Sequence, residues 1–515
     1  MSVKPVIDSC KSYHDATSYH RYHMVPHQLN WSDVPKPTKN YSGLETLPLQ
    51  RVQEFPEASL WGIVKHSCRT GEAKRVDFQA LSAVLLLGYG ITATQRTGGG
   101  IYRFRSVPSA GALFPAEVYS ASPEFSGHSA GLDYYDPESF TLSRLGKEAA
   151  FLQVLSALPS AGDPQRQASF LLSGIFYRSA WKYRQRAFRY VMLDVGHLIE
   201  NLVLALRFCR IPGEVHYDFN DRHLNRLLGL DTQREACFAC VNWGGVRGEK
   251  DISAVKSAAG TAPLSERYRQ AGKTAAEEIF YSEISDIRRI TSQPSTSSGT
   301  LPLDDRVTNK KPLSWYPVVK TDEPDKDELP FAETVRQRRS RRNFARTPLP
   351  LKKFMRLLDL MCEETGAGGP SVSAAAGACL TTGFLAGRVE GMDPGFYVLS
   401  GKERAYGVVE PGWLLDKMAH ACLDQLWLKF AAVHFLFMAN LRDIDEKIGA
   451  RGYRYALMNA GRLGHRLYLG AAAMRLGCCG IGALYDGEAR AVLSLNADSV
   501  LLYLVAVGPL TTPMG

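Results

Sequence analysis

The chain has 515 residues, of which 45% are hydrophobic and 22% charged, and its formal net charge is +9. These proportions are typical of globular proteins with large cores, and an excess of 61 basic over 52 acidic residues is too mild to indicate nucleic-acid binding. Because no apolar stretch is long enough to span a bilayer and residues 1–20 lack the apolar core of a secretory signal, we expect a cytoplasmic protein without a membrane or nucleic-acid partner.

The first half of the chain is predicted to begin with an ordered extension over residues 1–55, which are rich in Pro, Tyr and His and lack sustained periodicity. A first domain follows over residues 56–248. Its apolar spacing predicts an amphipathic helix at 77–87, a strand at 117–120, a long helix that begins at Ala187 and a final strand at 236–243.

The second half repeats this order after a bridge over residues 249–328. The bridge is predicted to contain a helical stretch at 265–291 and then a flexible linker rich in Ser, Pro and Thr. The second domain, residues 329–515, gives in turn a helix at 351–361, a strand at 396–399, a long helix from Gly452 and a strand at 500–507. Because helices and strands mix without regular βαβ alternation, we predict the α+β fold class.

The two long helices carry the clearest internal repeat. Arg189 pairs with Arg454 and Gly196 with Gly461, each at a spacing of 265 residues. This period is far longer than the roughly 20–50 residues of a solenoid repeat, so it indicates a duplicated domain. Small residues along the second helix predict that helices pack closely where the two copies meet.

Cysteine and histidine residues give no pattern of a metal site. The ten cysteines lack paired zinc spacing, and Cys237 and Cys240 lie in an apolar segment that predicts a buried strand. The N-terminal histidines have no acidic or cysteine partners nearby in the sequence. We therefore expect no metal.

A basic segment precedes the first predicted helix of each domain. In the second domain Arg338, Ser340 and Arg342 belong to the run RRSRRNF, and guanidinium groups beside a hydroxyl suit phosphate oxygens. A solvated basic helix end explains such a run as well. The first domain has a weaker version of the same segment, formed by Lys65, Ser67 and Arg69.

A loop of small residues precedes the first predicted strand of the first domain. It consists of Pro108, Ser109, Ala110 and Gly111. A backbone without bulky side chains lets a flat ligand lie against its N–H and C=O groups. A structural turn explains this composition equally well.

The full string around this loop, RSVPSAGALFPAEVY from Arg105 to Tyr119, resembles the signature of the SagB-type dehydrogenases, a branch of the nitroreductase-like flavoenzymes. The segment KYRQRAFRY from Lys182 to Tyr190, continuing to Gly196-His197 and Asn201, is similar to a second segment of that family. The run RRSRRNF resembles its phosphate motif. The duplicated chain resembles the tandem nitroreductase-like proteins, in which one chain supplies both halves of a dimer.

The resemblance implies two nitroreductase-like domains, each an antiparallel-rich sheet flanked by helices, that form an intrachain pseudo-dimer with FMN at the interface. One site would combine phosphate contacts of the second domain with the loop of the first: Arg338, Ser340, Arg342, Pro108, Ser109, Ala110 and Gly111. The reciprocal site would combine residues 374–378 with Lys65, Ser67 and Arg69. Arg247 would complete the phosphate contacts after the last strand of the first domain, and the second domain has no basic residue at that place. The sequence leaves open whether one or two FMN bind per chain.

The resemblance also implies catalytic roles for Lys182 and Tyr183. In SagB-type enzymes this pair is implicated in proton transfer, and a lysine desolvated beside a flavin is able to act as a base. A lysine that is merely exposed at a helix start is the alternative. The second domain has Lys447 at the corresponding place but Ile448 instead of the tyrosine.

Three functions are therefore compatible with the sequence. The first is an FMN-dependent oxidoreductase of SagB type that acts on a small or modified-peptide substrate, for example by oxidising azolines to azoles. The second is a nitro- or quinone reductase that takes electrons from NAD(P)H, a donor that docks transiently over the flavin. The third is a flavin-binding protein without turnover. Assembly beyond the intrachain pseudo-dimer stays open.

Overall fold

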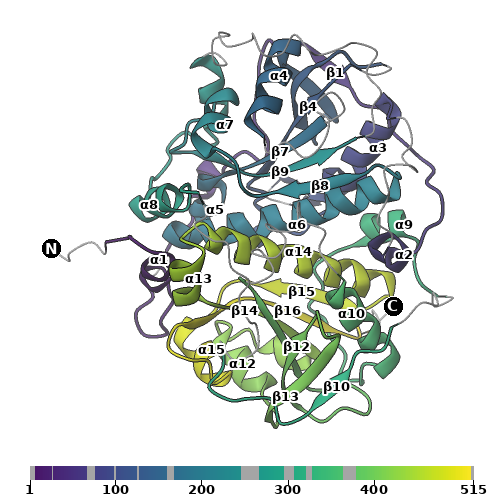
Figure 1. Cartoon of the computed structure of the whole chain (residues 1–515), viewed down its shortest axis with the longest axis vertical. Helices are drawn as coiled ribbons and strands as arrows, with labels where there is room; N and C mark the ends of the chain where they lie inside the picture. The colour runs from purple at the N-terminus through teal and green to yellow at the C-terminus, as the bar shows by residue number, and fades with distance from the viewer. Residues whose placement is uncertain are drawn as a thin grey trace.

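Two seven-stranded antiparallel sheets, one in each half of the chain, have the same strand order (Figure 1). The first runs β1-β6-β5-β4-β7-β9-β8 and the second β10-β13-β12-β11-β14-β16-β15. Sheets and flanking helices confirm the predicted α+β class. The computed structural model describes residues 6–25, 27–65, 76–97, 100–124, 127–158, 168–244, 266–294, 307–320, 327–363 and 379–511.

The first half builds its sheet from β1 (Thr46–Pro48), β4 (Ala116–Ser122), β5 (Gly131–Asp136), β6 (Thr141–Lys147), β7 (Ala168–Ile175), β8 (Gly213–His216) and β9 (Glu235–Trp243). A separate hairpin pairs β2 (Ile91–Thr97) with β3 (Gly100–Arg105). The helices of this half are α2 (Leu60–Lys65), α3 (Phe78–Tyr89), α4 (Glu148–Ala157), α5 (Phe176–Tyr183), α6 (Ala187–Phe208) and α7 (Asp221–Leu227).

The second half builds its sheet from β10 (Trp315–Pro317), β11 (Thr381–Ala386), β12 (Gly395–Ser400), β13 (Ala405–Pro411), β14 (Val433–Asn440), β15 (Gly477–Ile481) and β16 (Ser499–Gly508). Its helices are α9 (Phe331–Gln337), α10 (Leu351–Cys362), α12 (Leu415–Ala421), α13 (Leu441–Lys447), α14 (Gly452–Ala473) and α15 (Asp486–Val492). The strands predicted at 236–243, 396–399 and 500–507 correspond to β9, β12 and β16.

The long helices α6 and α14 lie side by side between the two sheets (Figure 1). Every residue from Ala187 to Leu206 and from Gly452 to Ala471 is buried. The sequence predicts one apolar face on each helix. The structure buries all faces, because each helix packs on its own sheet and on the helix of the other half.

Two glycines make this helix contact possible. A Cβ atom on Gly196 would lie 2.1 Å from the carbonyl oxygen of Met458, and one on Gly461 would lie 2.2 Å from the carbonyl oxygen of Leu193. No side chain fits at such distances, so the helices approach backbone to backbone. The predicted close packing of the repeated helices is confirmed, and its cause is this glycine pair.

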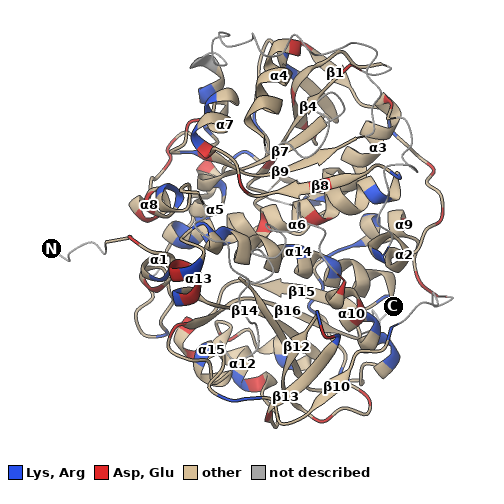
Figure 2. Cartoon of the chain, in the orientation of Figure 1, with Lys and Arg blue, Asp and Glu red and all other residues tan. Residues whose placement is uncertain are grey.

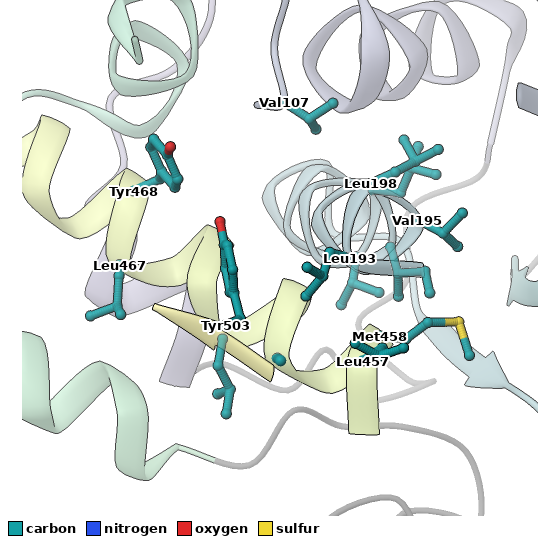
Figure 3. Packing of buried hydrophobic residues seen from close by; sticks show 14 of the residues in the cluster. Val107, Leu193, Val195, Leu198, Leu457, Met458, Leu467, Tyr468 and Tyr503 are labelled. Atoms are coloured by element: carbon teal, nitrogen blue, oxygen red, sulfur yellow. The ribbon is translucent and has the colours of Figure 1, made fainter. Parts of the chain in front are cut away.

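The hydrophobic core follows the same arrangement, with a central cluster that spans both halves and one outer cluster in each half. Figure 3 shows part of the central cluster, with Leu193 of α6 next to Tyr503 of β16 and with Leu457 and Met458 of α14 nearby. The strands β4, β7 and β9 are buried at every position because helices cover both faces of their sheet. Among the described residues, no helix has both the length and the apolar character needed to cross a membrane.

The N-terminal segment lies across both halves. Its helix α1 (Cys10–Ala16) packs on α13, where the backbone N–H of Cys10 donates to Asp445 at 3.0 Å. Further along, the ammonium group of Lys39 is buried in the first half and lies 2.7 Å from the carboxylate of Glu235. The segment thus ties the two sheets together from outside.

The bridge differs from the single helical stretch predicted at 265–291. A 3₁₀ helix covers Glu266–Gly272 and α8 covers Ser282–Ile290, with non-helical chain between them. In that gap the backbone N–H groups of Ala276 and Glu277 donate to the carboxylate of Asp33, at 2.9 Å each. Carboxylates therefore replace the carbonyl partners that a continuous helix would supply.

Candidate active site

A cleft opens between the two halves at the start of α6. The first half contributes the loop before β4, the end of α5 and one face of α6: Pro108, Ser109, Ala110, Gly111, Tyr183, Tyr190, Leu193, Asp194 and His197. The second half contributes Ser340, Arg342, Gln425, Tyr468, Cys479, Tyr503 and residues 480–483. The empty volume is about 720 Å³ when the mouth open to solvent is included.

The loop before β4 has a backbone that residues with side chains rarely adopt. Gly111, Ala112 and Phe114 have φ angles of 66°, 55° and 46°, and each such non-glycine residue costs on the order of 1–3 kcal/mol. A Cβ atom on Gly111 would lie 3.0 Å from the hydroxyl oxygen of Tyr183. A glycine here therefore lets Tyr183 lie against the loop, and strain of this kind is typical of functional sites.

Asp194 fixes this loop to α6. Its carboxylate accepts hydrogen bonds from the hydroxyl of Ser109 and, at 3.3 Å, from the backbone N–H of Ala110. Burial raises the pKa of Asp194 to about 7, although both hydrogen bonds act in the opposite direction. This carboxyl group therefore changes its charge near neutral pH.

Tyrosine hydroxyls of the second half form the opposite wall. His197 Nε2 lies 3.0 Å from the hydroxyl of Tyr503, and Ser340 Oγ lies 3.0 Å from the hydroxyl of Tyr468. The Tyr468 hydroxyl also accepts the backbone N–H of Gly480 at 2.7 Å. Burial, aided by His465 and Arg338, holds the pKa of His197 well below its ordinary value, so the imidazole is neutral.

The structure separates the three phosphate residues predicted in the second half. Ser340 and Arg342 are exposed and line the cleft next to the loop at 108–111. Arg338 is buried, and its Nε and Nη2 atoms donate to the carbonyl oxygens of Ser106 and Arg105, at 2.9 and 3.0 Å. It therefore braces the chain that leads into the loop of the other half, and its desolvation lowers its pKa to about 10.

The predicted catalytic pair lies at the last turn of α5. Tyr183 lines the cleft, and its ring centre is 4.2 Å from that of Tyr190. Burial raises the pKa of Tyr183. Lys182 is exposed at the rim, with Nζ 5.6 Å from the ring centre of Tyr183 and its Cδ 3.3 Å from the position of a Cβ on Gly111.

The second half of the chain is similar to a known protein family. Residues 335–509 match the nitroreductase family. The chain contains a nitroreductase-family domain. Because the first half repeats its sheet order strand by strand, the chain consists of two nitroreductase-like halves.

Individual relatives agree with this family. The chain is 26% identical over 181 residues to the nitroreductase-like protein MJ1384 of Methanocaldococcus jannaschii, an alignment that covers 35% of this chain and 91% of that protein. It is 28% identical over 156 residues to the trifolitoxin-processing protein TfxB of Rhizobium leguminosarum, covering 28% of this chain and 42% of TfxB. A solved nitroreductase-like protein of Anabaena variabilis superposes on 98% of this chain and all of its own, with a TM-score of 0.75 and 23% identity, which supports the tandem fold.

Most residues predicted for the reciprocal site lie outside the described part of the chain. Ser67, Arg69, Arg247 and the loop at 374–378 belong to segments that the structure does not describe. Lys65 is described, and its Nζ lies 3.0 Å from the buried carboxylate of Asp359.

Buried ion pairs join the two nitroreductase-like halves on both sides of the central helices. On the cleft side Asp486 lies 2.7 Å from Arg186 and 2.8 Å from Arg189. On the other side Asp221 lies 2.8 Å from Arg451 and 2.5 Å from Arg454. Each residue of one set is 265 positions from its counterpart in the other, so the arginines of the sequence repeat join the halves.

Several cleft residues are absent from the predicted site. Asp194, Tyr468 and Tyr503 are the main ones. A sequence signal exists for Asp194, because a carboxylate between Val191, Val195 and Leu198 on an apolar helix is rare without a function. No comparable signal exists for the tyrosines, which come from the other half of the chain.

Proposed function

We propose that the protein is an FMN-dependent oxidoreductase of SagB type that acts on a small or peptide-borne substrate. One observation carries this proposal: the cleft between the halves combines the strained small-residue loop of the first half with Ser340 and Arg342 of the second.

The residues of the cleft suit FMN. Ser340 and Arg342 would bind its phosphate, because a guanidinium and a hydroxyl both donate to phosphate oxygens and both are exposed here. The loop at 108–111 would support the ring through backbone groups, since its own side chains are small. Arg338 would hold that loop in place from behind through its bonds to Arg105 and Ser106.

FMN, when bound, supplies the two-electron chemistry. The chain would position the substrate and move protons, and we assign this role to Lys182 and Tyr183. Because burial raises the pKa of Tyr183, its hydroxyl stays protonated at neutral pH and is a hydrogen-bond donor. Lys182 stands beside it at the rim, in contact with solvent.

The likeness to TfxB, a trifolitoxin-processing protein, supports a peptide-borne substrate. An azoline that becomes an azole loses two electrons and two protons. The electrons and one proton would leave as a hydride to FMN, and the second proton would pass to the unprotonated amine of Lys182, which releases it to solvent, while Tyr183 donates a hydrogen bond to the substrate. A peptide too large to enter the cleft still reaches this pair, because Lys182 is exposed.

A nitro- or quinone reductase is the second candidate. It is favoured by the alignment with MJ1384, which covers 91% of that nitroreductase-like protein. In this case NAD(P)H would be the transient electron donor, and the Lys182–Tyr183 pair would have no essential role in proton transfer.

The first experiment is to purify the chain and identify any bound flavin by absorbance and by mass after denaturation. We expect FMN. A colourless chain that cannot be reconstituted with FMN contradicts both candidates and any flavin-carrier role.

The second experiment compares Lys182→Ala and Tyr183→Phe with Lys447→Ala, the control in the other half, for reduction of bound FMN by an azoline peptide. General acid–base roles are worth about 10²–10⁴-fold in rate, so we expect losses of this size for the first two variants, with FMN retained, and none for the control. Full rates in both variants, together with rapid reduction by NAD(P)H, favour the second candidate.

A further inference from the structure

Asp194 differs from the other buried carboxylates that hold the halves together. Asp486 and Glu200 each lie against two arginines. Asp194 is 5% exposed and lines the cleft, and no basic side chain of the described chain forms an ion pair with it; its partners are Ser109 and Ala110. A buried carboxylate without a cation is costly in its charged form.

The other half has an uncharged residue at the corresponding place. Asn459 lies 265 positions after Asp194, and its side-chain oxygen is 3.4 Å from the hydroxyl of Tyr217. Asparagine has the shape of aspartate but does not titrate. The ionisable group is therefore present only on the helix face that lines the cleft.

Several titratable and charged groups face Asp194 from the surrounding elements. They are Tyr89 of α3, Tyr183 of α5, Tyr190 and His197 of α6, Tyr468 of α14, Tyr503 of β16, and Arg342. Burial raises the pKa of each of these tyrosines and of the Cys479 thiol, which also lines the cleft. Burial also holds the pKa of His197 well below its ordinary value. Asp194 is thus the member of this group whose charge changes near pH 7.

A negative charge that enters the cleft strongly raises the pKa of such a carboxyl group. Like charges in a poorly hydrated site repel with several kcal/mol at an effective dielectric constant of about 20, and this repulsion favours the protonated acid. Because the pKa of Asp194 already lies at about 7, a further rise leaves the group protonated at neutral pH. Proton uptake then offsets the added charge.

We propose that Asp194 is a redox-linked proton acceptor, which takes one proton from solvent when two electrons enter the cleft and releases it when they leave. The inference rests on the proposed flavin site. Two electrons pass from the substrate, which is thereby oxidised, to FMN. The proton from solvent binds a carboxylate oxygen of Asp194, which becomes neutral. The hydroxyl of Ser109 modulates this uptake because its hydrogen bond favours the charged carboxylate.

The test is the midpoint potential of the bound FMN as a function of pH. In the unchanged chain we expect one additional proton per two electrons from about pH 7 upward. The Asp194→Asn variant should not take up this additional proton on reduction. Its flavin midpoint potential at pH 8 should be higher than that of the unchanged chain. Ser109→Ala should keep it but shift its onset to higher pH. Asn459→Asp, the reverse change in the other half, should leave the flavin potential unchanged.

A second readout follows the carboxyl group itself. Reduction of the unchanged chain at pH 7.5 (about half a unit above the onset) should produce an infrared band of a protonated carboxyl group that is absent in Asp194→Asn. Equal pH dependence of the potential in the unchanged chain and Asp194→Asn, with FMN bound in both, overturns the proposal and leaves the flavin site intact. If Asp194→Asn binds no FMN, the Ser109→Ala variant is the deciding test. The proposal is overturned if the additional proton uptake in Ser109→Ala begins at the same pH as in the unchanged chain. A chain that binds no FMN at all overturns both.

Discussion

The two interfaces between the halves share their ion pairs and differ in what lies beside them. Figure 2 shows charged residues on both central helices, between the sheets. On each side two arginines of one half bind an aspartate of the other, Asp486 or Asp221. Burial alone would raise the pKa of Asp486, but Arg186 and Arg189 hold it well below its ordinary value. These pairs position the halves.

Beyond these ion pairs the interfaces diverge. On the cleft side His197 faces the cleft and Tyr503. At the corresponding place Arg462 lies 2.8 Å from Glu200, and Arg466 lies 2.6 Å from the other oxygen of the same carboxylate; all three side chains are fully buried. Arg462 also donates to the hydroxyl of Tyr217 at 3.2 Å. The described part of the second interface is thus filled with a structural cluster.

Duplication within one chain allows the two interfaces to acquire different residues. In a symmetric homodimer a substitution changes both sites at once, because each residue occurs at both. In this chain one interface is able to keep an open cleft while the other becomes structural. We therefore expect one FMN per chain, at the interface that contains Asp194.

The largest effect should come from the structural cluster. Glu200→Ala leaves two buried guanidinium groups without their carboxylate and should lower the free energy of unfolding by about 3–5 kcal/mol, measured by chemical denaturation. Despite burial, Arg466 and Arg462 hold the pKa of Glu200 below its ordinary value, so its contribution to stability is present at neutral pH and is lost as the pH falls below about 4.

The control for Glu200→Ala is Glu446→Ala, which removes the exposed pair with Arg442 and should change stability by less than about 1 kcal/mol. Equal losses in the two variants would contradict the cluster's role.

The next effect should come from the contact between the helices. Gly461→Ala places a methyl group against the carbonyl oxygen of Leu193, and such overpacking costs roughly 1–3 kcal/mol. Gly487→Ala is the matched control, because a Cβ there meets nothing within 4 Å. Thermal unfolding should separate the two; a harmless Gly461→Ala would mean that the helices have room to move apart.

A pH-dependent effect on stability is expected at Asp194. Its pKa is raised in the folded chain to about 7 from an ordinary value of 3.8, so the wild-type carboxyl group increasingly destabilises the fold as the pH rises from about 4 to 7. Asp194→Asn should therefore stabilise the chain without flavin, and the gain should grow by roughly 2 kcal/mol between pH 5 and pH 7. A gain that is the same at both values would show that the carboxyl group titrates normally.

The smallest effect should come from Tyr217→Phe. Its hydroxyl bridges Arg462 and Asn459, and the loss of one such bond costs about 1 kcal/mol. FMN content should not change. A variant that loses FMN would place a flavin at the second interface.

Local sequence patterns predicted the helices and strands well. Contacts between segments that are far apart in the sequence could not be predicted from these patterns. The helix at 77–87 and the strands at 236–243 and 500–507 follow from apolar spacing and correspond to α3, β9 and β16. Ser340, Arg342 and the loop at 108–111, which the family resemblance combines in one site, line the same cleft, and their role in binding stays a prediction. The partners of Arg338 could not be predicted, because the carbonyl oxygens of Arg105 and Ser106 reach it only through the packing of the two halves.

The most direct test of one binding and one structural interface is the molar ratio of FMN to chain after saturation with FMN and removal of unbound flavin, measured by absorbance and amino-acid analysis. We expect one FMN per chain, and the same ratio in Tyr217→Phe. A ratio of two in the unchanged chain would show that both interfaces bind flavin, and would contradict the division into one binding and one structural interface.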